Sequence, residues 1–116
     1  MILELRTYRL RPGTTDAFVR LMTGEAARLL EQHEIRVVAS GASLVPEEPG
    51  LEEAYLVRAF ASLEERERQE TAFYGSPEWV DGPRQAVLAC IESYHTVVLE
   101  VPEAAVVALE RSAATA

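Results

Sequence analysis

The order of strand-like and helical patterns along the chain is the feature that most restricts its fold. Residues 1–10, 35–40, 52–60 and 94–101 have strand patterns, and helical patterns separate the first strand from the second and the third from the fourth. This β-α-β-β-α-β order predicts a ferredoxin-like α+β fold, an antiparallel sheet with its helices on one face. The other face of such a sheet would be bare in a monomer, so the order also predicts a homodimer.

Local signals place the helices within this order. Apolar residues at helical spacing predict a first helix over 16–33, and Ser62 followed by Glu65 is a capping-box pattern that opens a second helix. Pro77 is suited to the first position of a short helix, and residues 83–93 also have a helical pattern. Residues 64–70 carry alternating charges, which predicts a solvated helix face.

Length and charge exclude several classes of protein. A chain of 116 residues has room for one core, which we assign to residues 1–101, with residues 102–116 as a helical or frayed tail. A net charge of -8 argues against nucleic-acid binding. The single cysteine excludes an internal disulfide and a cysteine-based zinc site, and two distant histidines give no support for a metal. With no span for a bilayer and no signal-peptide pattern, we expect a soluble, cytoplasmic protein.

The first strand alternates two kinds of side chain. Leu3 and Leu5 are expected to face the core, and the pleat then sends Glu4, Arg6 and Tyr8 together to the opposite face. One hypothesis is that Arg6 orients an anionic or carbonyl-bearing substrate while Tyr8 donates a hydrogen bond. The alternative is an internal Arg–Glu pair that only stabilises the assembly, because a buried arginine needs a partner.

Other residues suggest a site more weakly. His95 and Tyr94 are neighbours in the last strand, so only one of them faces inward, and either is a candidate base for removing an acidic proton. Arg58 follows the reasoning given for Arg6. Phe73 and Trp79 flank a break between helices, where aromatic side chains either roof an apolar pocket or fill the end of the sheet.

Three segments carry a family resemblance. The segments "ELRTYRLRPGTTDAF", "LLEQH" and "SLEERERQETAFYGSPEW" resemble the NIPSNAP family in order and spacing, over roughly residues 1–100. The resemblance implies a dimeric α+β barrel in which two ferredoxin-like protomers face their sheets together, and it aims Glu4, Arg6 and Tyr8 at the barrel interior. Relatives of this architecture include small antibiotic-biosynthesis monooxygenases, isomerases and cyclases, several of which need no metal or organic cofactor.

The chain departs from the family pattern in two places. Glu34 stands where the family often has glycine, so we expect the end of the first helix to close differently. Leu56 and Arg58 stand where the family commonly has histidine and tryptophan, which predicts a different pocket.

The sequence leaves two functions open. The first is a cofactor-independent enzyme that oxygenates, isomerises or cyclises an aromatic or polyketide-like molecule, with His95 or Tyr94 as base. The second is a non-catalytic binding or protein-interaction scaffold.

Overall fold

The computed structural model describes residues 1–115, and side chains up to Ser112. Four strands form one antiparallel sheet in the order β2-β3-β1-β4. The elements in chain order are β1 (Ile2–Leu10), α1 (Thr15–Thr23), α2 (Glu25–Gln32), β2 (Arg36–Ala42), β3 (Glu52–Phe60), α3 (Leu63–Tyr74), α4 (Pro77–Val80), α5 (Arg84–Cys90), β4 (Ile91–Glu100) and α6 (Glu103–Thr115). The ferredoxin-like α+β fold predicted from the element order is confirmed.

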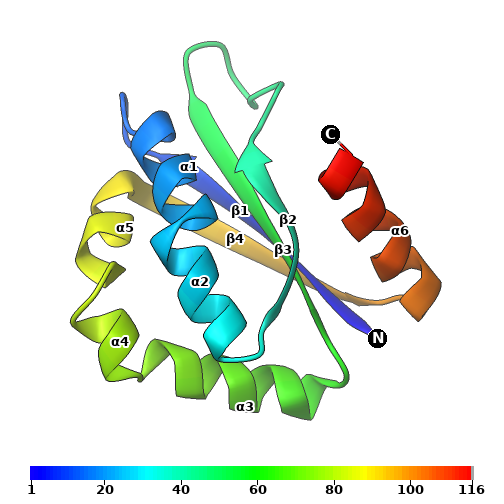
Figure 1. Cartoon of the computed structure of the whole chain (residues 1–116). Coiled ribbons are helices and arrows are strands. Elements are labelled where there is room, and N and C mark those ends of the chain that lie inside the picture. The colour runs from blue at the N-terminus through cyan, green and yellow to red at the C-terminus, as the bar shows by residue number, and fades with distance from the viewer. Residues whose placement is uncertain (116) are drawn as a thin grey trace.

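The helices are divided between the two faces of the sheet. Helices α1 to α5 cover one face, and α6 lies on the other side, next to β2 (Figure 1). The larger core fills the space under α1 to α5, where Phe18, Leu30 and Phe60 are almost completely buried. The smaller core lies under α6, where Val106 packs on Leu3 and Val38.

The faces of β1 are the reverse of those expected from the sequence. Leu3 belongs to the core under α6, whereas Tyr8 belongs to the core under α1 to α5. Glu4 and Arg6 share the pleat with Tyr8, so all three point towards the helical layer and not towards the open sheet face. The expectation failed because α6 supplies a second apolar layer, which gives the leucines their own core.

Two helix boundaries differ from the pattern-based prediction. The helix expected over 16–33 is two helices, because Gly24 leaves the helical conformation between α1 and α2. The helix expected over 83–93 ends at Cys90, and β4 begins at Ile91. The predicted caps are present, since Ser62 Oγ accepts from the Glu65 amide and Pro77 opens α4.

Helix α2 ends in the backbone conformation that glycine usually adopts at the end of a helix. The Glu34 amide donates to the Glu31 carbonyl and the Ile35 amide to the Leu30 carbonyl, which is the Schellman pattern. Glu34 takes the left-handed conformation with φ of 61°. The expectation of a different closure was therefore wrong, and the glutamate carries the backbone strain that glycine would avoid.

The tail predicted over 102–116 is helical in its described part. α6 runs from Glu103 to Thr115, and the prediction for Ala116 lies outside the described residues. Arg36 on β2 holds the helix by donating two hydrogen bonds to the Glu110 carboxylate, at 2.9 and 2.6 Å. This pair and the buried Val106 fix α6 to the sheet.

Candidate functional site

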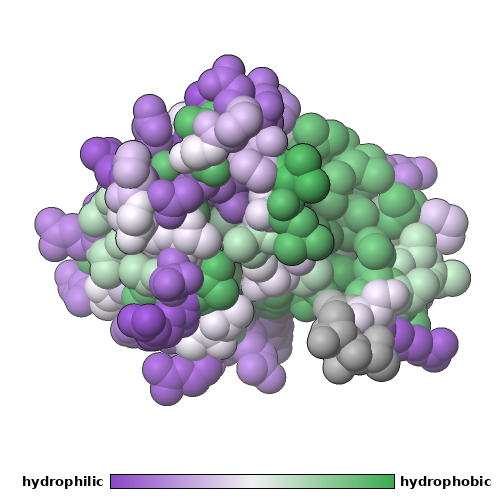
Figure 2. Space-filling view, turned by 90° about the horizontal axis from the view of Figure 1, so that it is seen from above, coloured by the Kyte–Doolittle hydropathy of each residue, from purple (hydrophilic) through white to green (hydrophobic). Residues whose placement is uncertain are grey.

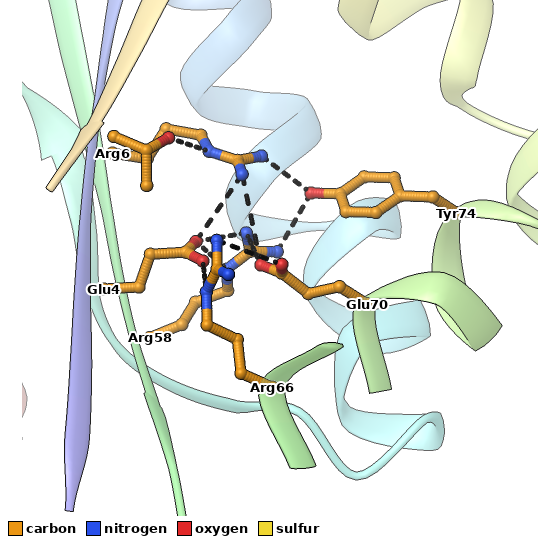
Figure 3. A network of polar contacts seen from close by, with 7 residues as sticks. Glu4, Arg6, Arg58, Arg66, Glu70 and Tyr74 are labelled. Atoms are coloured by element: carbon orange, nitrogen blue, oxygen red, sulfur yellow. Dashed lines mark hydrogen bonds and ion pairs between the residues drawn. The ribbon is translucent and has the colours of Figure 1, made fainter. Parts of the chain in front are cut away.

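A cluster of charged side chains lies between the sheet and α3, and we call it the arginine–glutamate cluster (Figure 3). Its members are Glu4, Arg6, Arg58, Arg66, Glu70 and Tyr74.

The sheet register and the helix period bring the cluster together. Glu4 on β1 lies directly opposite Arg58 on β3, so their side chains leave the sheet side by side on the helical face. Arg66, Glu70 and Tyr74 follow one another at intervals of four residues on α3, which places them in one stripe that faces the sheet.

Glu4 and Arg58 form the buried centre of the cluster. Both side chains are completely buried, and Arg58 donates to the Glu4 carboxylate through Nε, at 3.0 Å, and through Nη2. Arg58 Nη2 also donates to Glu70 at 2.6 Å, and Arg66 Nε donates to the second Glu4 oxygen at 2.6 Å. These bonds compensate the cost of removing both charges from water.

The Tyr74 hydroxyl joins two arginines at the edge of the cluster. Arg6 Nη1 and Arg58 Nη1 each donate to its oxygen at 3.0 Å. A hydroxyl oxygen has two acceptor positions, and these two bonds occupy both. The Tyr74 proton therefore points away from the arginines and is available to an acceptor.

Burial and neighbouring charges shift the pKa values of Glu4 and Glu70 in opposite directions. Burial alone would raise the pKa of Glu4, but the hydrogen bond from Glu70 and the charge of Arg58 lower the pKa to about 2. Burial and the hydrogen bond to Glu4 raise the pKa of Glu70 to about 7. Near neutral pH Glu4 is therefore ionised, whereas Glu70 is partly protonated.

A cavity of about 460 Å³ opens beside the cluster, between the sheet and the helices. Most of its wall is apolar, and its polar end is formed by Arg6, Arg58 and Glu70. Exposed lining residues, among them Leu88 and Tyr94, place its mouth between α5 and β4. The lining residues are Arg6, Tyr8, Met22, Ala26, Leu30, Leu56, Arg58, Glu70, Phe73, Tyr74, Trp79, Arg84, Val87, Leu88, Ile91 and Tyr94.

Aromatic side chains form much of the wall. Phe73 and Trp79 pack with ring centroids 5.2 Å apart, and Tyr74 meets both of them edge to face. Tyr8 is buried, and burial raises its pKa to about 12, so its hydroxyl keeps its proton at neutral pH. Tyr94 lies at the mouth, where the Arg6 guanidinium stands 5.0 Å from its ring centroid.

Most residues suggested by the sequence surround this cavity. Arg6, Tyr8, Arg58, Phe73, Trp79 and Tyr94 line it. Glu4 is placed behind the wall, where it binds Arg58 and Arg66. Leu56 and Arg58, the residues of β3 that depart from the family pattern, also line it.

His95 does not share the cavity with Arg6. It lies opposite Thr7 in the sheet register, on the face that α1 to α5 leave open, whereas Tyr94 lies opposite Tyr8. His95 instead lines a polar hollow together with Glu47 and Glu53. The structure therefore brings Tyr94, and not His95, to the cavity.

Sequence reasoning missed the contribution of α3. The charged run over 64–70 predicts a solvated face, which holds for Arg68 and its partner Glu65 but is wrong for Arg66 and Glu70. The available signal was the spacing of Arg66, Glu70 and Tyr74, which marks a polar stripe on one side of the helix.

Metal-binding clusters and membrane-spanning helices are both absent from the described part of the chain. Within it, no group of three or more histidine, cysteine, aspartate or glutamate side chains is placed to hold a metal ion. The helices described there are also too short or too polar to cross a membrane.

The fold and the cavity define a ferredoxin-like α+β domain with a pocket between its sheet and its helices. The chain belongs to the NIPSNAP family, whose family model matches residues 3–102. No curated protein matches the sequence.

Solved structures with the same fold include NIPSNAP proteins that are described as uncharacterised or of unknown function. A NIPSNAP domain protein from Burkholderia xenovorans is 20% identical, with a TM-score of 0.72 over 88% of this chain and 95% of that chain. A NIPSNAP family protein from Agrobacterium tumefaciens is 23% identical, with a TM-score of 0.76 over 87% of each chain. An antibiotic biosynthesis monooxygenase is similar at 10% identity, with a TM-score of 0.58 over 88% of this chain and 99% of that chain.

Proposed function

We propose that the cavity binds a small, largely apolar molecule that carries a carbonyl or anionic group. The observation that carries this proposal is the division of the cavity into an apolar wall and one polar end. Its volume of about 460 Å³ falls within the range of about 300–1,000 Å³ that is usual for small-molecule sites. Phe73, Trp79 and Leu30 would contact the apolar body, and Arg6 would orient the polar group.

The polar end has the groups that a cofactor-independent reaction requires. Oxygenation, isomerisation and cyclisation of an enolisable or phenolic molecule all begin with removal of a proton and stabilisation of an oxyanion. Glu70 has a pKa near neutrality and lies at the cavity, which suits a group that exchanges protons. Arg6 and Tyr74 would stabilise the oxyanion, and the structural likeness to an antibiotic biosynthesis monooxygenase is consistent with such a reaction.

The alternative is a binding protein or interaction scaffold without turnover. One observation favours it, since Glu4 and Arg58 are saturated by bonds to each other and to their neighbours. Incubation of the protein with an enolisable ligand in D₂O separates the two functions, because an enzyme exchanges the acidic proton faster than buffer and a scaffold does not.

We also propose that the open sheet face pairs with a second copy of the chain. Tyr55 and Val97 on this face are exposed, and Leu5 and Val57 beside them are only partly buried. Apolar surface gathers on the side of the molecule that carries α6 (Figure 2). An apolar sheet face of this kind is covered in most proteins, and self-pairing is the usual solution.

The binding proposal is tested by narrowing the mouth of the cavity. We expect 2-acetylnaphthalene, a neutral apolar ketone, to give saturable heat in a calorimetric titration of the wild-type protein. Leu88→Trp should weaken this binding at least tenfold, because Leu88 lines the mouth. Leu109→Trp is the matched control, since Leu88 and Leu109 are both 43% exposed and Leu109 lies on α6, away from the cavity. Equal affinity in both variants would reject the proposal, and so would a failure of the wild type to bind both this ketone and 2-naphthoate.

A further inference from the structure

The charge of the cavity is opposite to the charge of the protein. The chain as a whole has a net charge of -8, yet the charged residues among those that line the cavity are Arg6, Arg58, Arg84 and a single glutamate, Glu70. The inner end shows the same imbalance. Three guanidinium groups in the arginine–glutamate cluster face two carboxyl groups, which leaves at least one positive charge without a counter-charge.

Arg6 is the arginine of this cluster whose charge is least compensated among Arg6, Arg58 and Arg66. Its Nε donates to Thr96 Oγ1 at 3.1 Å and its Nη1 to Tyr74, two neutral acceptors. Its Nη2 makes only two long ion pairs, at 3.7 Å to the Glu4 carboxylate and 4.0 Å to Glu70, and both are beyond hydrogen-bond distance. Arg58, in contrast, is bonded directly to both carboxyl groups.

Two donors therefore lie side by side at the polar end. One is Arg6 Nη2, and the other is the Tyr74 hydroxyl, whose oxygen accepts from Arg6 Nη1 at 3.0 Å and whose proton has no acceptor among the described residues. Two adjacent donors, one of them on a cation, match the two oxygens of a carboxylate. A neutral carbonyl would leave the positive charge of Arg6 with only its two long ion pairs in a largely apolar cavity.

We propose that the cavity takes the anion of an apolar carboxylic acid, with its carboxylate held by Arg6 and the Tyr74 hydroxyl. This inference rests on the proposed function and specifies its ligand class. The carboxylate supplies the negative charge that the cluster lacks, and the aromatic wall contacts the rest of the molecule.

The same geometry couples binding to a proton. Glu70 is within reach of the proposed carboxylate, and a second negative charge there favours the protonated form of Glu70. The groups that face Glu70 are Glu4 and Arg6 from β1, Arg58 from β3, and Arg66 and Tyr74 from α3. Because the pKa of Glu70 is already about 7, binding at neutral pH should take up part of a proton and should weaken as the pH rises from 6 to 8.5.

The test compares a carboxylate with its neutral isostere. We expect 2-naphthoate to bind at least ten times more tightly than 2-naphthamide in calorimetric titrations at pH 6.5. Arg6→Gln and Tyr74→Phe should each remove most of this preference without abolishing the binding of the amide. Arg9→Gln is the matched control, since it removes the same charge from the opposite face of the same strand and should leave the preference intact.

Proton uptake provides a readout that a merely structural role would not change. Titrations at pH 7 in buffers of different ionisation enthalpy should show uptake of part of a proton by the wild type and none by Glu70→Gln. Equal affinity for naphthoate and naphthamide would overturn the inference and leave the proposed function standing. Failure of both probes to bind would overturn the two together. Retention of the preference in folded Arg6→Gln and Tyr74→Phe would also reject the inference.

Discussion

Glu4 and Arg58 lie opposite each other on adjacent strands and form an ion pair that is completely buried. The pair is the fixed part of the cluster, because each member is also held by groups on α3. It therefore ties the sheet to α3 and holds the polar end of the cavity in place.

Breaking this pair should destabilise the protein strongly. We expect Glu4→Gln or Arg58→Met alone to lower the free energy of unfolding by about 3–5 kcal/mol, because each leaves the partner charge buried without its directly opposed counter-charge. The double variant Glu4→Gln with Arg58→Met should lose less than the sum of the two single variants. Urea denaturation measures all three, and strictly additive losses would contradict the direct pairing. Arg9→Met, which breaks an exposed pair with Glu47, serves as the control and should change stability by less than about 1 kcal/mol.

The raised pKa of Glu70 gives stability a defined dependence on pH. In the unfolded chain Glu70 titrates near 4.5, whereas its pKa in the folded protein is about 7. Between these values the folded state binds more protons than the unfolded chain. The contribution of Glu70 to stability therefore falls as the pH rises from 4.5 to 7. Glu4 affects stability over a different pH range. Because its pKa is lowered in the folded protein, its contribution to stability is lost as the pH falls from 4.5 towards 2.

The measurement for Glu70 is urea denaturation at several pH values. The difference in unfolding free energy between wild type and Glu70→Gln should decrease as the pH rises from 4.5 to 7. A constant difference across this range would show that Glu70 titrates alike in the folded and unfolded states.

Glu34 offers a stabilising substitution. Its left-handed backbone at the end of α2 is costly for a residue with a side chain, so Glu34→Gly should raise the free energy of unfolding by about 1 kcal/mol. The backbone carbonyl that accepts from Gln69 would be retained. Thermal and urea denaturation measure the change, and a loss of stability would show that the conformation carries no strain.

The proposed pairing of open sheet faces predicts a charge-sensitive dimer. Val97→Glu places a negative charge on this face and should shift the protein towards monomer in analytical ultracentrifugation. Val80→Glu is the control, because Val80 on α4 is 48% exposed and Val97 is 47% exposed. A monomeric wild type, or equal behaviour of the two variants, would contradict the pairing.

Much of the fold follows from local patterns, and the errors have identifiable causes. Strand and helix order and the Ser62 cap depend on nearest neighbours, and these predictions are confirmed. The faces of β1 depend on which side carries the larger helical layer, which the alternation of Leu3 with Glu4 does not specify because both faces have an apolar core.

The candidate site was harder to predict than the fold. Arg6, Tyr8 and Trp79 were recognisable as aromatic or charged residues in unusual positions. Glu70 and Arg66 were not recognisable as site residues. A charged helical segment has the same composition whether its polar side faces solvent or a buried glutamate. Only the sheet register, which sets Glu4 beside Arg58 and under α3, distinguishes the two cases.

The location of the ligand is the central claim, and the two methionines provide the most direct test. Met22 lines the cavity, and Met1 packs against the core on the other face of the sheet. With ¹³C-labelled methionine methyl groups, addition of 2-naphthoate should shift the Met22 signal through the ring current of the bound probe and leave Met1 unchanged. A shift of Met1 alone, or of neither signal at saturating probe, would contradict the account.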